Sequence, residues 1–184
     1  MIAAVPAFAA SRPLSGVDPD MMARAMKVLA RKRRHLLDAE LFAIVDYSRP
    51  SRDTRFHIVR TDSGEVMDFH VSHGRGSDPE HTGYLESFSN EFGSLASSAG
   101  AYVTSEIYRG KHGRSMRLKG LDFSNSNAEP RGIVIHAAAY AEPDMLARTG
   151  KLGRSEGCFA FSELDLFLVL RQLGPGRLIY ADKG

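Results

Sequence analysis

The 184-residue chain contains no tryptophan and a single cysteine, Cys158. One cysteine cannot form an intramolecular disulfide, so its thiol either packs in the core or takes part in chemistry. No apolar run approaches the ~18 residues that a membrane span requires, so the sequence predicts no integral membrane segment. The formal net charge of +2 is too small to indicate a nucleic-acid partner. A chain of this length is expected to fold around one core.

The N-terminal segment is apolar and contains small residues. Its Ala7-Phe-Ala9 run has the form that signal peptidases recognise, but no basic residue precedes it. We interpret residues 1–17 as the remnant of an export signal or as a disordered leader.

Residues 18–40 are expected to form a basic N-terminal helix. Asp18 followed by Pro19 is typical of a helix N-cap and first turn. We interpret the many Lys and Arg residues as a solvated face that shields an apolar stripe. The alternative is contact with an anionic envelope polymer or a membrane surface.

From residue 41 the hydrophobic period becomes strand-like. Strands are expected at 41–47, 55–60, 65–71, 101–108, 115–121, 132–137 and 177–181, with a short helix over 162–173. The segment 72–100 is rich in Gly, Ser and Asn and is predicted to be a functional loop, because it lies between strands. The sequence therefore predicts a mainly β, mostly antiparallel domain over residues 41–184, with an N-terminal helix and one short late helix.

Cys158 follows the turn Ser155-Glu-Gly157, and His136 ends a strand 22 positions earlier. If the two flanking strands are neighbours, His136 can take the thiol proton, which a cysteine must lose to become a nucleophile. Gly157 permits a tight turn whose amides face a developing oxyanion. Arg154 is close enough in sequence to bind a substrate carboxylate. A buried, unreactive cysteine is the alternative.

Metal and nucleotide sites are not predicted. His70 and His73 are three residues apart on an expected strand, which places them on opposite faces, and no carboxylate cluster accompanies them. The pair Gly74-Arg-Gly76 lacks the third glycine and the following helix of a nucleotide-binding loop. No cofactor is expected.

Several separate motifs occur in the order found in one family. The chain resembles the L,D-transpeptidase catalytic domain (YkuD-type) family, in its murein L,D-transpeptidase branch, from Leu41 to the C-terminus. Members carry a strand-end histidine and a later Ser/Thr-x-Gly-Cys turn, matched here by His136 and by Ser155-Glu-Gly-Cys158. The segments His73–Ser77 and Tyr108–Ser115 also fit the branch.

The resemblance implies a β-sandwich or barrel-like fold and cysteine-dependent acyl transfer on peptidoglycan stem peptides, in the periplasm or cell envelope. Cys158 would form a thioester, with His136 as general base oriented by the backbone carbonyl of Ala137. Backbone amides at Gly157 and Cys158 would form the oxyanion hole. A carbapenem adduct is expected at Cys158. The expected substrate-binding residues are Ser155, Arg154, His73 and Tyr140.

Glu156 departs from the family pattern, in which many members have His or Trp. A carboxylate beside the nucleophile would raise the thiol pKa unless it points away. The sequence leaves the acceptor open, because water in place of an amine gives an L,D-carboxypeptidase or amidase. It also leaves open a non-catalytic peptidoglycan-binding module and a cytosolic cysteine hydrolase.

Overall fold

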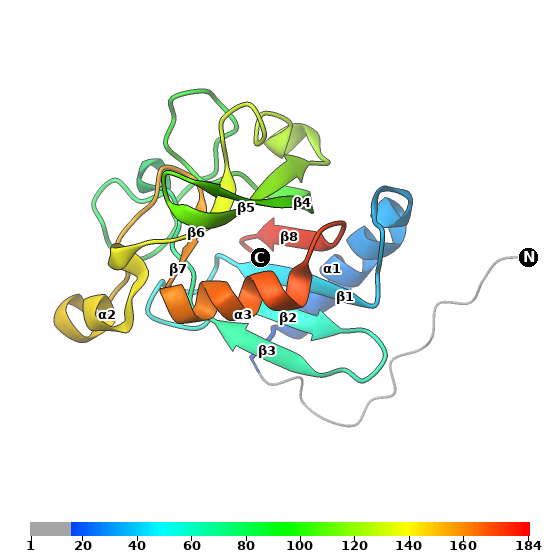
Figure 1. Cartoon of the computed structure of the whole chain (residues 1–184). Helices are drawn as coiled ribbons and strands as arrows, with labels where there is room; N and C mark the ends of the chain where they lie inside the picture. The colour runs from blue at the N-terminus through cyan, green and yellow to red at the C-terminus, as the bar shows by residue number, and fades with distance from the viewer. Residues whose placement is uncertain (1–15) are drawn as a thin grey trace, which may run out of the picture.

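Eight strands form one mixed sheet in the order β3-β2-β1-β8-β4-β5-β6-β7 (Figure 1). The computed structural model describes residues 16–184, so the expected export signal lies almost entirely outside the described residues. The strands are β1 (Leu41–Asp46), β2 (Phe56–Arg60), β3 (Val66–Phe69), β4 (Gly100–Gly110), β5 (Gly113–Gly120), β6 (Val134–Ala137), β7 (Phe159–Phe161) and β8 (Leu178–Asp182). The prediction of a mainly β fold with an N-terminal and a late helix is confirmed.

Strand β1 has apolar residues on both faces because it is covered on both sides. Leu41, Ala43 and Val45 belong to one core cluster, whereas Phe42 and Ile44 belong to the other. Strand β1 pairs with β2 in antiparallel and with β8 in parallel fashion. A strand buried on both faces reads as a continuous hydrophobic run, as this one does.

Helix α1 (Pro19–Lys32) packs on β1 and β8. The Asp18 carboxylate accepts hydrogen bonds from the amides of Asp20 and Met21, which caps the helix as the sequence predicts. The helix ends at Lys32 and continues as the 3-10 turn η1 (Arg33–His35), so it is shorter than the helical segment expected over residues 18–40. Its apolar stripe, which packs on the sheet, is Met21, Met22, Ala25, Val28 and Leu29.

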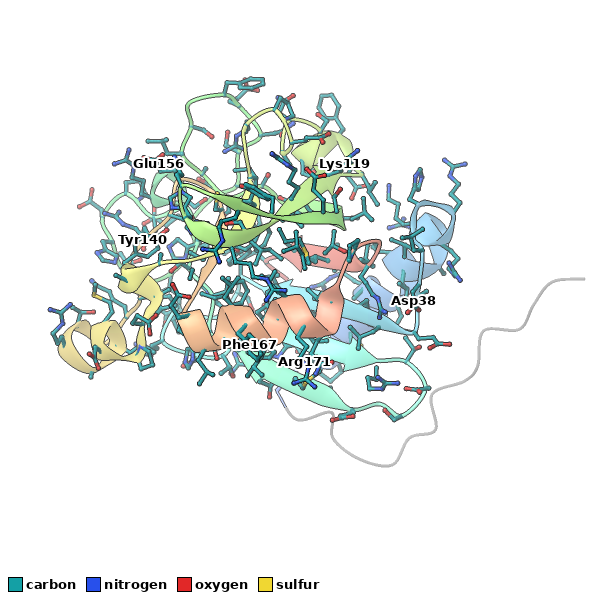
Figure 2. The ribbon with its side chains drawn as sticks, in the orientation of Figure 1. Asp38, Lys119, Tyr140, Glu156, Phe167 and Arg171 are labelled. Atoms are coloured by element: carbon teal, nitrogen blue, oxygen red, sulfur yellow. The ribbon has the colours of Figure 1, made fainter. Side chains whose placement is uncertain are left out.

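Helix α3 (Glu163–Leu173) covers the other core cluster, with Ser162 as its N-cap. Figure 2 shows Phe167 and Arg171 on this helix, and both are exposed. The buried side chains of α3 are Leu166, Val169, Leu170 and Leu173. No helix within residues 16–184 is both long enough and apolar enough to cross a membrane.

The segment between His136 and Cys158 contains a helix that the sequence did not indicate. Helix α2 (Pro143–Thr149) follows the 3-10 turn η4 (Ala139–Ala141) and ends at Gly150, which has a φ of 71°. None of its residues is buried. Because the helix buries no apolar face, it leaves no hydrophobic period, and the sequence predicted no helix here.

The segment 72–100 was expected to be a long loop; before β4 begins at Gly100 it contains only the 3-10 turn η2 (Arg75–Ser77), and backbone hydrogen bonds hold it in place. A Cβ at Gly76 would lie 1.9 Å from the Ser94 carbonyl oxygen, and one at Gly74 would lie 2.4 Å from the Leu95 carbonyl oxygen. The two glycines therefore permit close approach of two stretches of backbone. The remaining 3-10 turn within residues 16–184 is η3 (Phe123–Asn125).

Candidate active site

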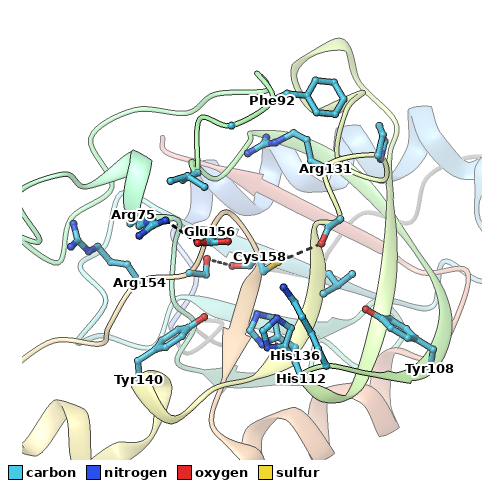
Figure 3. A pocket seen from close by; sticks show the side chains of 17 residues that line it. Arg75, Phe92, Tyr108, His112, Arg131, His136, Tyr140, Arg154, Glu156 and Cys158 are labelled. Atoms are coloured by element: carbon cyan, nitrogen blue, oxygen red, sulfur yellow. Dashed lines mark hydrogen bonds and ion pairs between the residues drawn. The ribbon is translucent and has the colours of Figure 1, made fainter.

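One pocket of about 670 Å³ contains both Cys158 and His136 (Figure 3). The parallel pairing of β6 with β7 brings them together, because His136 lies opposite Ala160 and Cys158 immediately precedes β7. The pocket is lined by Arg75, Phe92, Gly93, Leu95, Tyr108, Lys111, His112, Pro130, Arg131, Gly132, Val134, His136, Tyr140, Arg154, Ser155, Glu156 and Cys158.

The His136 imidazole is fixed by its backbone neighbour. Nδ1 lies 2.8 Å from the carbonyl oxygen of Ala137 and donates a hydrogen bond to it. This bond leaves Nε2 unprotonated and able to accept a proton. Burial is the main cause that lowers the pKa of His136 below its ordinary value, and the side chain is 2% exposed. The ring is therefore neutral at neutral pH, as a general base must be.

Burial also raises the pKa of the Cys158 thiol above its ordinary value. Its Sγ lies 3.6 Å from the Gly132 carbonyl oxygen, to which the thiol donates. A hydrogen bond from the Val134 backbone opposes the effect of burial, and the Glu156 carboxylate adds to it. At rest the pocket thus contains a thiol and a neutral imidazole, and the thiol needs a base to become a nucleophile.

The turn before Cys158 is held by a serine hydroxyl. The Ser155 Oγ accepts from the Gly157 amide at 3.1 Å and donates to the Cys158 carbonyl at 2.7 Å. Because the Gly157 amide is already engaged by Ser155, this geometry does not leave it free for the oxyanion role expected from the sequence. Gly157 is needed for space, since a Cβ there would lie 2.6 Å from the Ala96 carbonyl oxygen, and its φ is 110°.

The sequence model of the L,D-transpeptidase catalytic domain family matches residues 14–181. The chain belongs to this family. A search of curated proteins gave no match.

The fold is similar to those of solved L,D-transpeptidases. L,D-transpeptidase 3 from Mycobacterium tuberculosis is 14% identical with a TM-score of 0.50, and the match covers 78% of this chain and 61% of that one. The same enzyme in complex with a faropenem-derived adduct is 14% identical with a TM-score of 0.49, covering 78% and 60%. An L,D-transpeptidase from Mycobacterium smegmatis is 14% identical with a TM-score of 0.47, covering 78% and 58%. The chain thus spans about 60% of the length of these proteins.

The pocket of this L,D-transpeptidase domain is lined by four cationic side chains, Arg75, Lys111, Arg131 and Arg154, and by one acidic side chain, Glu156. Glu156 pairs with Arg75 at 2.9 Å, and both side chains are more than half exposed. Arg131 donates to the Ser89 and Ala96 carbonyl oxygens, at 2.9 and 2.6 Å. Carbonyl partners do not neutralise a guanidinium, so the pocket keeps an excess of positive charge.

Arg154 and Tyr140 both line the pocket, as the sequence analysis expected of substrate-binding residues. The Arg154 guanidinium donates to the carbonyl oxygens of Asp78 and Pro79, which positions it but leaves its charge uncompensated. Burial raises the pKa of Tyr140, so its hydroxyl is protonated at neutral pH and can donate a hydrogen bond.

His73, also expected to bind substrate, is not among the pocket residues and is 1% exposed. Its Nδ1 lies 2.7 Å from Nη2 of Arg55 and its Nε2 lies 3.1 Å from the Asp78 carboxylate. Since Arg55 donates, Nδ1 accepts and Nε2 carries the hydrogen. The His73 backbone carbonyl accepts from the Ser155 amide at 2.8 Å, so His73 supports the turn before Cys158.

The sequence analysis did not single out His112, although it noted the motif Tyr108–Ser115. Its ring stacks on that of His136, with centroids 4.2 Å apart and planes 23° apart. The hairpin that carries His112 reaches the pocket only through tertiary packing, for which the sequence holds no local signal. Among residues 16–184, no cluster of three or more His, Cys, Asp or Glu side chains is arranged to hold a metal ion.

Proposed function

We propose that the protein is a cysteine-dependent L,D-acyltransferase that acts on peptidoglycan stem peptides, with Cys158 as nucleophile and His136 as general base. The observation that carries this proposal is the shared pocket of the two residues together with the hydrogen bond from Nδ1 of His136 to Ala137. That bond selects the tautomer whose free Nε2 can accept the thiol proton.

In the first half-reaction, His136 Nε2 takes the proton of the Cys158 thiol as Sγ attacks the carbonyl carbon of the donor peptide. The developing oxyanion is proposed to meet the Cys158 amide in place of the Gly157 amide, which is bonded to Ser155. The peptide C–N bond then breaks, His136 returns the proton to the leaving amine, and a thioester remains on Cys158.

In the second half-reaction, an amine of another stem peptide attacks the thioester carbonyl. His136 accepts the proton of this amine, the C–S bond breaks, and the Cys158 sulfur regains a proton. Atoms and charge balance over the two steps without a redox partner or a cofactor. Water in place of the amine gives a free carboxylate, which is the L,D-carboxypeptidase or amidase alternative.

The charge of the pocket supports an acidic peptide as substrate. Arg131 and Arg154 contact only neutral oxygens among the described residues, and Lys111 also lines the pocket. A cleft with an excess of one charge raises the local concentration of oppositely charged ligands. Stem peptides carry free carboxylates, so this field favours their entry. Because such peptides occur in the cell wall, we propose a periplasmic or cell-envelope location.

The test is intact-mass spectrometry of the protein incubated with a carbapenem, beside a Cys158→Ala control. A one-to-one adduct that is absent from the control is expected, because a carbapenem is an acyl donor that an activated cysteine can open. The protein is then incubated with tetrapeptide stems and an amine acceptor. Cleavage without any cross-linked product would assign the hydrolase alternative.

The base role of His136 is tested by alkylation of the Cys158 thiol with iodoacetamide. His136→Ala is expected to slow alkylation at neutral pH on the order of tenfold or more, because general-base assistance contributes at least that much. Unchanged alkylation would remove His136 from the base role. A protein that neither forms an adduct nor cleaves stems, with Cys158 still alkylatable, would point to the binding-module alternative.

A further inference from the structure

The strand that carries His136 provides one hydrogen bond to its ring, and this bond holds only one edge of the imidazole. The hydrogen bond from Nδ1 to the Ala137 carbonyl sets the tautomer and holds one edge of the imidazole. The second side-chain torsion of histidine is broad, so a single edge contact does not define the plane of the ring. A base must nonetheless present Nε2 along the direction of the thiol proton.

His112 supplies the missing contact. It stands in the two-residue turn between β4 and β5, where Gly110 pairs with Gly113 across the hairpin. Its ring lies 4.2 Å from that of His136 with an interplanar angle of 23°, a stacked arrangement (Figure 3). His112 is exposed while His136 is 2% exposed, so His112 forms the outer cover of the buried ring.

Side-chain contacts between β4 and β5 stabilise the hairpin. The guanidinium of Arg117 lies 4.3 Å from the centroid of the Tyr108 ring and donates to Glu106 at 2.7 Å. Gly110 packs so closely on Tyr108 that a Cβ there would lie 2.7 Å from the ring. A two-residue turn fixes the register of the two strands that it joins, and this register determines where the side chain of His112 lies.

We propose that His112 is a positioning residue, which stacks on His136 and holds the imidazole in the plane that directs Nε2 at Cys158. The catalytic part of this inference rests on the proposed function, in which His136 is the general base. The stacking of His112 on His136 and its effect on the ring do not depend on the substrate. It assigns to the β4–β5 hairpin a part in the site that the Cys–His pair alone does not reveal.

The first test follows the state of His136 directly in the full chain. Nitrogen-15 NMR of labelled histidine distinguishes the two neutral tautomers, and the expected wild-type signal for His136 is the Nδ1-protonated form. In His112→Ala, the ring gains freedom and water contact, so the tautomer signal is expected to become averaged. The pKa of His136 is expected to rise, because its burial and the charge of His112 both lower it. Lys111, the other charged group that lowers this pKa, remains in the variant, as does Cys158.

The second test measures the rate of imipenem acylation. His112→Ala is expected to lower this rate on the order of tenfold at neutral pH, because a misplaced base loses much of the benefit of orientation. His112→Phe keeps a planar ring in the stack and is expected to retain most of the rate and the single tautomer. His35→Ala, which removes an exposed histidine outside the pocket, is the matched control.

The outcomes separate this inference from the proposed function. An unchanged rate, tautomer signal and His136 pKa in His112→Ala would overturn the positioning role. A His112→Phe variant as slow as His112→Ala, with the tautomer intact, would also overturn it and indicate that a ring nitrogen of His112 transfers protons. If the wild-type protein forms no imipenem adduct, the proposed function fails, while the NMR comparison still decides the role of His112.

Discussion

The fold is expected to lose about 3 kcal/mol of stability through His73 alone when the pH falls from 7 to about 4. Burial, followed by the charge of Arg55, lowers the pKa of His73 from 6.5 to about 4. The unfolded chain therefore binds this proton at a higher pH than the folded chain does. The contribution of His73 is complete above pH 6.5 and is lost as the pH falls toward 4. At 1.36 kcal/mol for each pH unit, the difference amounts to roughly 3 kcal/mol.

The contacts of His73 explain why protonation is costly. Its Nδ1 accepts from Arg55 at 2.7 Å, so a proton on Nδ1 would face a donor in a site that is 1% exposed. Burial lowers the pKa of Arg55 to about 10, which leaves the guanidinium charged throughout this range. The new cation would therefore sit beside an existing one, partly offset by Asp78.

The assay is urea denaturation of the wild type and of His73→Gln at a series of pH values. A glutamine side chain can accept from Arg55 and donate to Asp78 but does not titrate. The wild type is expected to lose about 3 kcal/mol more than the variant between pH 7 and 4. The pKa values of His57 and His136 are also lowered by burial, but both residues are present in both proteins, so their contributions cancel. Equal losses in the two proteins would refute the reasoning.

Three further substitutions test the turn before Cys158 and the loop beneath it. Ser155→Ala removes two hydrogen bonds from a site that is 2% exposed, and is expected to lower the free energy of unfolding by about 2–4 kcal/mol. Glu156→Gln removes a carboxylate that raises the pKa of the thiol, so iodoacetamide alkylation is expected to shift toward lower pH. Gly76→Ala places a Cβ 1.9 Å from a backbone oxygen, and is expected to cost about 1–3 kcal/mol in urea denaturation.

Each of these three predictions has a control variant or a measured outcome that would contradict it. Ser162→Ala removes a single helix-capping hydrogen bond, at 3.1 Å, and is expected to cost about 1 kcal/mol. A Ser155→Ala loss no larger than that would mean the hydroxyl does not bridge the turn. Glu65→Gln, an exposed site outside the pocket, controls for net charge, and an equal shift there would deny a local effect of Glu156. An unaltered stability of Gly76→Ala would show that the two backbone stretches can separate freely.

The sequence predicted most of the strands and singled out His136 and Cys158 as residues that neighbouring strands would bring together, because both features leave local signals. Alternating or continuous apolar runs indicated β1, β2 and β6, and the order of strand-end histidine and Ser-Glu-Gly-Cys turn placed the two residues on neighbouring strands. The N-cap at Asp18 was equally local. These elements depend on short-range preferences, which sequence reasoning can use directly.

The positions of His73 and His112 depend on contacts between segments that are distant in the sequence. The sequence therefore did not predict these positions. A histidine in a Gly- and Ser-rich segment resembles an exposed binding residue until Arg55, 18 positions earlier, is known to bond with it. The hairpin bearing His112 reaches His136 because β5 pairs with β6, and no spacing rule predicts that pairing. Arg154 lines the pocket, but its hydrogen bonds to the carbonyl oxygens of Asp78 and Pro79 could not be foreseen.

The fully buried Arg55 is connected to the turn before Cys158 through His73. Its guanidinium donates to the carbonyl oxygens of Val71 and Arg49 and to His73, at 2.7 to 3.0 Å. A lysine ammonium cannot reach these separate acceptors at once, so Arg55→Lys is expected to cost about 2–4 kcal/mol in urea denaturation.

The loss at Arg55 is also expected to reach the active site, since the His73 carbonyl accepts from the Ser155 amide at 2.8 Å and the Ser155 hydroxyl holds the turn before Cys158. Alkylation of the Cys158 thiol in folded Arg55→Lys should therefore slow relative to the wild type. If stability falls while alkylation is unchanged, the buried network supports the fold alone. If stability and alkylation fall together, the hydrogen bonds that connect Arg55, His73 and Ser155 also position Cys158.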